Sequence, residues 1–325
     1  MPYVKPRIPP RFALLFMLLI IGIAPLQAQN NMALGALSHD RDSSFDVRVQ
    51  LDWREGLFSA QTGFTIASAG LQLPSGRLMA ERILEQEWPT LIRPYLLSIR
   101  VDSQFTLGEL LESGTLALND LDNVSQSTAK TPPSLSQDMT SIIGRYTVRL
   151  SDLGGVLLRS TRSLALGSEE DFLPRRFPEP QIPLIPAQTA DYTGIIILAH
   201  RQLPIRGRQS QALIVPSLFP RIWDTNMNLI YDRSMLDAPD NTLTVRYTSP
   251  ESVFRMTPSG LDGELSALVG LRPLRILARE VFGMHPTDPV IDRDDALQIL
   301  SSPHNRRLLR EGRVVLVLDA SVLGN

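Results

Sequence analysis

The chain is divided by the proline-rich stretch Asp171-Phe-Leu-Pro-Arg-Arg-Phe-Pro-Glu-Pro-Gln-Ile-Pro-Leu-Ile-Pro-Ala187. Each proline in it lacks a backbone N–H and biases the preceding residue toward extended backbone. Helices and central strands therefore cannot pass through this stretch, and we expect a stiff, polyproline-like spacer that holds two domains apart. We assign residues 166–190 to this linker, residues 45–165 to a first domain and residues 191–325 to a second.

The amino terminus has the three parts of a secretory signal. Basic residues at Lys5, Arg7 and Arg11 precede the apolar run 12–24, and Ala28 offers a small residue for cleavage. A membrane anchor is the alternative, but a bilayer span needs about 20 apolar residues and this run is shorter. We expect residues 1–28 to be a signal peptide, followed by a flexible lead at 29–44 and no transmembrane span after cleavage. Whether the signal is cleaved or kept stays open.

The composition limits the compartment and the partners. The 325 residues include no cysteine, which excludes an acylated thiol, a disulfide framework and a thiolate metal site. Without residues 1–28 the formal charge changes from −2 to −5, because three basic and no acidic residues are lost. An exported, acidic, cysteine-free chain is typical of the periplasm, and nucleic acid is not an expected partner. We expect a periplasmic protein that is not a lipoprotein.

The first domain shows strands before and after a long helix. Residues 45–53 alternate apolar and polar side chains, which predicts a half-buried strand, and 57–67 can return as its hairpin partner. Apolar residues at three- and four-residue steps predict a helix over 79–96, in which Pro89 introduces a kink or starts a second helix. Residues 119–141 read as a long polar loop, and 146–150 as another strand.

The second domain is predicted to be built on two buried strands. The continuous apolar runs at 192–199 and 312–319 are typical of strands that are covered on both faces, and we expect them to pair. Residues 219–231 read as a hairpin that turns at 224–226, and 273–279 as a further strand. Asp292 is placed to cap a short helix that ends near Leu300. The fold class is therefore α+β: two small mixed α/β domains joined by a proline-rich linker, after a signal peptide.

The sequence lacks the common catalytic motifs. Ser127-Thr-Ala-Lys130 has a Ser-x-x-Lys spacing, but that motif needs a helix and prolines follow at once. His285 lies near Asp288, Asp292, Asp294 and Asp295, yet this run does not resemble a calcium loop. The other histidines, His39, His200 and His304, fall in unrelated segments. We predict no enzyme activity, no cofactor and no metal site.

Two small basic groups are the candidate contacts with a partner. They consist of Arg201, Arg206 and Arg208 after the first buried strand, and of Arg306 and Arg307 near the carboxyl terminus. Arginine side chains at such positions can contact an anionic envelope polymer or an acidic protein, although a solvated loop is the favoured explanation for so few charges. The three tryptophans at 53, 88 and 223 are expected to pack in the core.

The turn and strand signatures also resemble a known group of proteins. The second domain carries Tyr192-Thr-Gly-Ile-Ile-Ile-Leu-Ala-His-Arg201, then Phe219-Pro-Arg-Ile-Trp-Asp224, then Asp288-Pro-Val-Ile-Asp292. These signatures, with Ala69-Gly-Leu-Gln-Leu-Pro-Ser-Gly-Arg77 in the first domain, resemble uncharacterised exported bacterial proteins similar to lipoprotein-20 and flagellar assembly protein T type envelope modules. The resemblance implies a non-enzymatic α/β envelope protein and supplies no catalytic residue.

The sequence therefore predicts a periplasmic scaffold or binding module, with a link to flagellar or cell-envelope assembly. A peptidoglycan-acting enzyme that uses the acidic residues near 290 is one alternative, and a small-ligand-binding protein is another. The identity of the partner and the oligomeric state stay open.

Overall fold

The computed structural model describes residues 44–126, 128–165, 182–237, 243–254 and 263–324. The predicted signal peptide and most of the predicted linker lie outside these ranges. Both halves of the described chain contain helices and sheets, so the predicted α+β class is confirmed.

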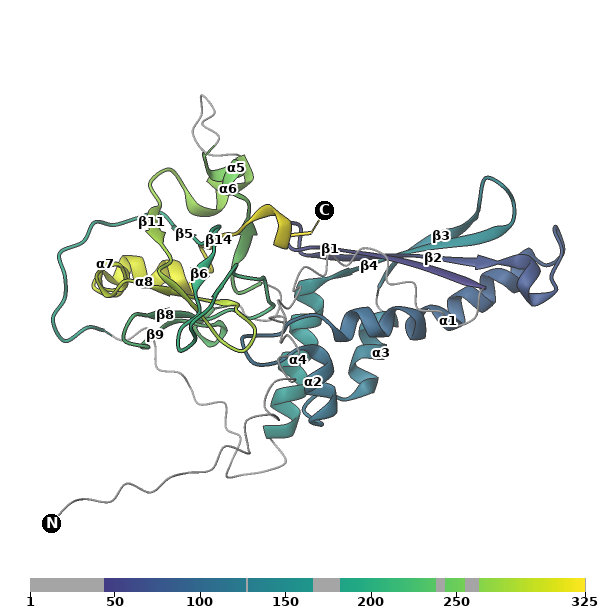
Figure 1. Cartoon of the computed structure of the whole chain (residues 1–325), viewed down its shortest axis with the longest axis horizontal. Coiled ribbons are helices and arrows are strands. Elements are labelled where there is room, and N and C mark those ends of the chain that lie inside the picture. The colour runs from purple at the N-terminus through teal and green to yellow at the C-terminus, as the bar shows by residue number, and fades with distance from the viewer. Residues whose placement is uncertain (1–43, 127, 166–181, 238–242, 255–262, 325) are drawn as a thin grey trace, which may run out of the picture. The chain divides into compact units, whose positions relative to one another are not determined.

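The first domain contains a four-stranded antiparallel sheet (Figure 1). Its order is β1-β2-β4-β3, and the strands are β1 (Phe45–Asp52), β2 (Leu57–Thr65), β3 (Ala129–Leu135) and β4 (Ser141–Arg149). Alternate residues of β2 and β4 are buried, including Phe58, Ala60, Tyr146 and Val148. The sheet therefore has one covered and one open face, as the alternation in the sequence predicts.

Helices cover one face of this sheet. They are α1 (Arg77–Leu97), α2 (Leu107–Glu112), α3 (Leu118–Gln126) and α4 (Leu150–Ala165), with a short 3₁₀ turn, η1 (Ile66–Ala69). In α1 every fourth residue from Ala80 to Ile92 is buried, and the Trp88 ring stacks on Tyr146 with 4.0 Å between ring centroids. The helix is one element through Pro89, because packed side chains on both sides of the proline hold it against the sheet. A second helix starting at Pro89 was the wrong alternative.

The prediction of a long loop over 119–141 is wrong. This stretch contains α3 and the edge strand β3. Only two apolar residues, Leu121 and Val124, anchor α3 in the core, so its periodicity is hidden by the polar residues around them. Strand β3 includes Pro132 and Pro133, which an edge strand tolerates at the register shift between Thr131 and Ser134.

The second domain is built on a parallel sheet of order β10-β14-β5-β11. Its strands are β5 (Ile195–Leu198), β10 (Arg246–Thr248), β11 (Leu274–Leu277) and β14 (Val314–Val317). The predicted pairing of the two buried apolar runs is confirmed, since β5 and β14 are neighbours with Val314 opposite Ile195. All four residues of β14 are fully buried.

A second sheet of order β12-β13-β8-β9 completes this domain. Its elements are β8 (Ile222–Asp224), β9 (Leu229–Tyr231), β12 (Glu280–Phe282) and β13 (Asp288–Ile291), with a small hairpin of β6 (Leu203–Pro204) and β7 (Gln211–Ala212). The helices are α5 (Pro250–Phe254), α6 (Gly263–Val269), α7 (Arg293–Leu300) and α8 (Pro303–Arg310), and the 3₁₀ turns are η2 (Arg233–Met235) and η3 (Ala320–Val322). The predicted turn between β8 and β9 and the predicted strand at 273–279 are confirmed.

The two domains are in direct contact. The backbone N–H groups of Leu218 and Phe219 donate to the carbonyls of Arg100 and Val101, at 3.0 and 2.7 Å. The Trp53 N–H donates to the Leu323 carbonyl at 3.0 Å, and one buried apolar cluster includes residues of both domains. The expectation that a linker holds the domains apart is therefore wrong for the residues that the structure describes.

The segment that enters the second domain is bonded to its helices. The Ala187 N–H donates to Ser301 Oγ at 2.8 Å, and the Tyr192 N–H donates to Asn305 Oδ1 at 3.0 Å. The buried Asn305 amide donates in turn to the Ala190 carbonyl at 2.9 Å. The carboxyl end of the predicted linker is thus fixed on α7 and α8, while residues 166–181 lie outside the described ranges.

Replacing Gly194 by alanine is expected to destabilise the second domain. A Cβ atom at Gly194 would lie 2.5 Å from the Val269 Cα, so α6 would have to move away from β5. We expect a loss of about 1–3 kcal/mol in the free energy of unfolding, which urea titration measures. Gly263→Ala is the matched control, because nothing lies within 4 Å of its Cβ position and alanine favours a helix. Equal effects of the two substitutions would contradict this account.

Candidate functional site

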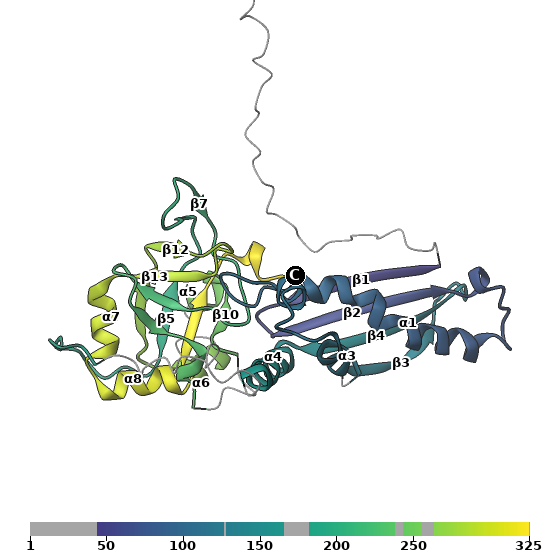
Figure 2. The ribbon, with the colours of Figure 1, turned by 90° about the horizontal axis from the view of Figure 1, so that it is seen from below.

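The first predicted basic group lies on and beside the β6–β7 hairpin, which extends from the second domain (Figure 2). Arg201 precedes the hairpin and Arg208 lies in its loop, and both side chains are exposed. Within the described part of the chain neither of them has an ion-pair partner. Gly207, with φ 79°, gives the loop the left-handed turn that it needs.

Arg206 fixes the base of this hairpin. Its Nη1 donates to Glu280 Oε2 at 2.7 Å and its Nη2 donates to the Thr225 carbonyl at 2.8 Å. Its backbone N–H donates to the Val281 carbonyl at 2.8 Å. Arg206 is half-buried and charge-compensated, so its role in the described structure is to hold the hairpin against β12 rather than to present a free charge.

The second predicted basic group lies elsewhere, on α8. The Arg306 Nη1 donates to the Leu300 carbonyl, which satisfies the end of α7, whereas Arg307 is exposed. Figure 2 draws α8 and the β6–β7 hairpin at opposite sides of the second domain. The two predicted groups are therefore separate, and in the first group Arg201 and Arg208 are the arginines whose side chains are exposed.

The acidic residues after His285 do not converge. Asp292 takes the N-cap position of α7 as predicted, but its carboxylate bonds to Arg279 Nη2 at 2.6 Å instead of capping the helix. Asp288 is buried in β13, and His285 Nε2 lies 3.5 Å from Glu109 Oε2 of the first domain. Burial, and next the neighbouring Asp292, raise the pKa of Asp295. Among the described residues no group of three or more acidic or histidine side chains could hold a metal ion.

Asp288 has the most organised polar surroundings of these carboxyl groups. Its oxygens accept hydrogen bonds from the Arg221 backbone N–H at 3.1 Å, Trp223 Nε1 at 3.1 Å and Thr287 Oγ1 at 2.9 Å. Burial nevertheless raises the pKa of Asp288, because desolvation of the charge outweighs these donors. Trp223 is half-buried and donates to a carboxylate, which the prediction of simple core packing missed.

The surroundings of Asp288 join the two domains. Arg221 bonds with its side chain to Asp102 Oδ2 at 3.4 Å, and the His285 N–H donates to the Ser103 carbonyl at 3.0 Å. Gly283, with φ 118°, lies against Ser103, where a Cβ atom would approach within 2.4 Å. This arrangement positions a loop of the first domain, and we assign Asp288 a structural role.

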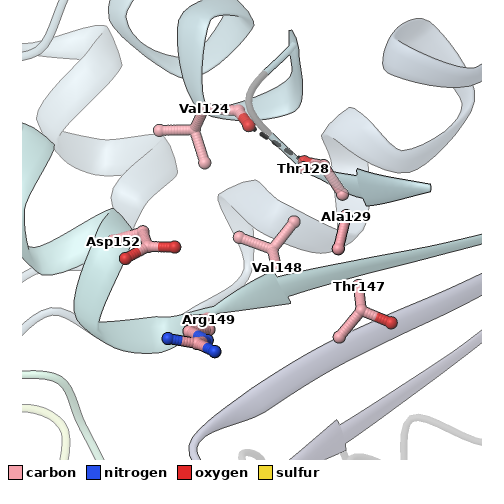
Figure 3. Close-up of a pocket in the computed structure, with 7 residues that line it drawn as sticks. All are labelled: Val124, Thr128, Ala129, Thr147, Val148, Arg149 and Asp152. Atoms are coloured by element: carbon pink, nitrogen blue, oxygen red, sulfur yellow. Dashed lines mark hydrogen bonds between the residues drawn. The ribbon is translucent and has the colours of Figure 1, made fainter.

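A small pocket opens in the first domain (Figure 3). It lies where α3, β3, β4 and α4 meet, and its volume is about 240 Å³. The lining residues are Val124, Thr128, Ala129, Thr147, Val148, Arg149 and Asp152. The pocket is smaller than the roughly 300–1,000 Å³ that is usual for drug-sized ligands. Sequence reasoning missed it, because two of its walls were predicted to be a loop.

Other residues considered from the sequence are separate from these sites. Lys130 lies in β3 with its Nζ 5.5 Å from the centroid of the Trp88 ring, so the strand excludes the helix that a Ser-x-x-Lys motif needs, while Ser127 lies outside the described residues. His304 Nε2 lies 2.7 Å from the Tyr192 carbonyl, and the His200 ring meets Phe254 edge-on. His39 lies outside the described residues.

No helix in the described ranges has the length and hydropathy of a membrane span. The apolar run at 12–24 lies outside those ranges, so the predicted leader stays a prediction.

Comparison with known proteins finds a family model that matches each of the two domains. Residues 44–156 match the family model of the N-terminal domain of Treponema pallidum Tp0624, and residues 194–320 match the family model of its second domain. The first range overlaps the predicted domain at 45–165, and the second lies within the predicted domain at 191–325. No curated protein matches the chain. The chain is therefore similar to the N-terminal domain and the second domain of Tp0624, in that order.

Proposed function

We propose that this chain is a non-enzymatic periplasmic protein of the cell envelope that acts as a scaffold or binding module, with a link to envelope or flagellar assembly. The observation that carries this proposal is the β6–β7 hairpin, in which Arg206 holds the base while Arg201 and Arg208 are exposed. The sequence of the amino terminus supports export, because it has the three parts of a signal peptide.

The geometry of the hairpin suits recognition of an acidic partner. A guanidinium group presents a planar fork of N–H donors that matches carboxylate and phosphate groups. Because the base of the hairpin is fixed by three hydrogen bonds of Arg206, less conformational entropy is lost when its loop binds. An acidic protein surface or an anionic envelope polymer is the class of partner that these arginines fit.

The two alternatives have less support. A peptidoglycan-acting enzyme would use the acidic residues near 290. However, Asp292 is paired with Arg279, and Asp288 is buried and accepts hydrogen bonds from three donors. A small-ligand-binding protein would use the pocket beside Arg149, whose volume of about 240 Å³ is small. Asp292→Ala is expected to lower stability because it breaks the ion pair with Arg279, and neither Asp292→Ala nor Asp295→Ala is expected to remove an activity.

In-cell photo-crosslinking from the hairpin tests the proposal. A photo-reactive residue at Gln209 is expected to capture an envelope or flagellar component, and the double variant Arg201→Glu and Arg208→Glu is expected to lower this capture by about tenfold. The control exchanges two exposed arginines of the first domain, Arg82→Glu and Arg145→Glu, with the same change in net charge. Capture of no envelope component, or fractionation of the chain with the cytoplasm, would overturn the proposal.

A further inference from the structure

The sheet of the first domain has two edges that differ in kind. Strand β3 forms one edge and carries Lys130, two prolines and a register shift, which are the usual devices against edge-to-edge pairing. Strand β1 forms the other edge, which Figure 2 shows along the outside of the sheet. It has eight residues in unbroken register with β2 and contains no proline, lysine or bulge.

The backbone groups on the outer side of β1 belong to its odd-numbered residues. The Thr65 N–H donates to the Ser44 carbonyl at 2.8 Å, so residues 44, 46, 48 and 50 direct their N–H and C=O groups toward β2. Phe45, Val47 and Val49 direct theirs outward, and within the described chain those groups have no partner. Their side chains are half-buried, so apolar surface remains along this edge.

The carboxyl-terminal segment already occupies the far end of the edge. The Trp53 N–H donates to the Leu323 carbonyl, and Gly324 packs so closely on Leu51 that a Cβ atom there would lie 1.8 Å from the Leu51 carbonyl oxygen. A further strand can therefore pair only with the stretch Phe45–Val49.

We propose that this stretch pairs with the same stretch of a second copy of the chain, antiparallel, with Val47 opposite Val47. This register places Asp46 opposite Arg48 of the other copy twice, at non-hydrogen-bonded positions where cross-strand side chains lie closest. Both side chains are largely exposed, 65% and 72%, and within one chain they form an ion pair with each other at 3.2 Å. The result is a continuous eight-stranded sheet.

Neighbouring registers are less favourable. A shift of one step toward the amino terminus places Asp46 opposite Asp46, and like charges opposite each other are destabilising. A shift of one step toward the carboxyl terminus places Arg48 opposite Arg48 and needs the outer side of Leu51, which Gly324 covers. The charges and the carboxyl-terminal segment thus select the same register.

Charge exchange tests this proposal on the purified full chain by analytical ultracentrifugation. The wild-type chain is expected to be a dimer, and Asp46→Arg or Arg48→Asp alone is expected to raise the dimer dissociation constant about tenfold or more. An equimolar mixture of these two variants is expected to restore dimers, because each supplies the charges that the other needs. Arg145→Asp, an exposed arginine on β4, is the control and is expected to leave the dimer unchanged.

Val47→Pro tests the backbone pairing separately. Its backbone change removes an outward N–H and leaves the hydrogen bonds with β2 in place, while loss of the half-buried valine side chain is expected to lower the melting temperature of the monomer without unfolding it. We expect this variant to be monomeric. A monomeric wild-type chain at the highest soluble concentration, a Val47→Pro variant that dimerises like the wild type, or a variant mixture that stays monomeric would overturn the proposal. If the wild-type chain is monomeric but binds another protein through β1, the second copy is the wrong occupant.

Discussion

Deleting residues 313–325 is expected to abolish folding of the second domain. The deletion removes β14, which lies between β10 and β5 in the parallel sheet. The side chains from Val314 to Leu318 are fully buried, and burial of each contributes about 1.5–3 kcal/mol. Their sum is comparable with the 5–15 kcal/mol of a typical domain. Limited proteolysis measures this directly, as loss of the soluble, protease-resistant fragment that begins near residue 191.

A shorter deletion is the matched control for this experiment. Removing residues 320–325 keeps β14 but removes the fully buried Leu323 and the acceptor of the Trp53 N–H. We expect the second domain to fold and the free energy of unfolding to fall by about 2–5 kcal/mol, as for loss of a buried leucine. A protease-resistant second domain after deletion of residues 313–325 would show that β14 is dispensable.

Patterns of apolar residues predicted the central elements of both domains. The strict alternation at 45–53 is typical of a strand with one buried face, and the continuous apolar runs at 192–199 and 312–319 are typical of strands buried on both faces. The structure has strands at all three places. The sequence Thr106-Leu-Gly-Glu109 has the spacing of a capping box, and it caps α2. The Glu109 N–H donates to Thr106 Oγ1 at 3.3 Å and the Thr106 N–H donates to Glu109 Oε2 at 2.6 Å, so both bonds depend on neighbouring residues alone. Patterns of neighbouring residues were therefore sufficient to predict these strands and this helix start.

Contacts between residues that are far apart in the sequence could not be predicted from such local patterns. Arg206 was predicted to be a candidate contact with a partner, but its side chain pairs with Glu280, which is 74 residues away in the sequence. Asp102 and Arg221 are 119 residues apart in the sequence. No local sequence pattern therefore predicts that the first-domain loop near Ser103 packs beside Asp288 of the second domain. The candidate contacts were predicted as two groups of arginines, and the tertiary structure separates the exposed Arg201, Arg208 and Arg307 from the two that bond within the domain, Arg206 and Arg306.

Asp288→Ala is expected to be the most damaging single substitution in the contact region of the two domains. It leaves three donors, the Arg221 N–H, Trp223 Nε1 and Thr287 Oγ1, without their acceptor in a buried place. An unsatisfied buried donor costs about 1–3 kcal/mol, so we expect a loss of about 3–5 kcal/mol in urea titrations. Asp288→Asn keeps the size and one acceptor oxygen, and we expect about 1–2 kcal/mol.

The pH dependence of stability, compared between the wild-type chain and Asp288→Asn, tests how burial of the Asp288 carboxyl affects the free energy of unfolding. Burial raises the pKa of the Asp288 carboxyl above its ordinary value of 3.8, so the folded chain binds this proton more tightly than the unfolded chain. Its contribution to stability is complete below pH 3.8 and is lost as pH rises through the raised pKa of the folded state. The free energy of unfolding of the wild-type chain, minus that of Asp288→Asn, is therefore expected to fall as pH rises from 3.8. A difference that rises with pH would mean that the three donors outweigh desolvation and that the carboxylate is held charged.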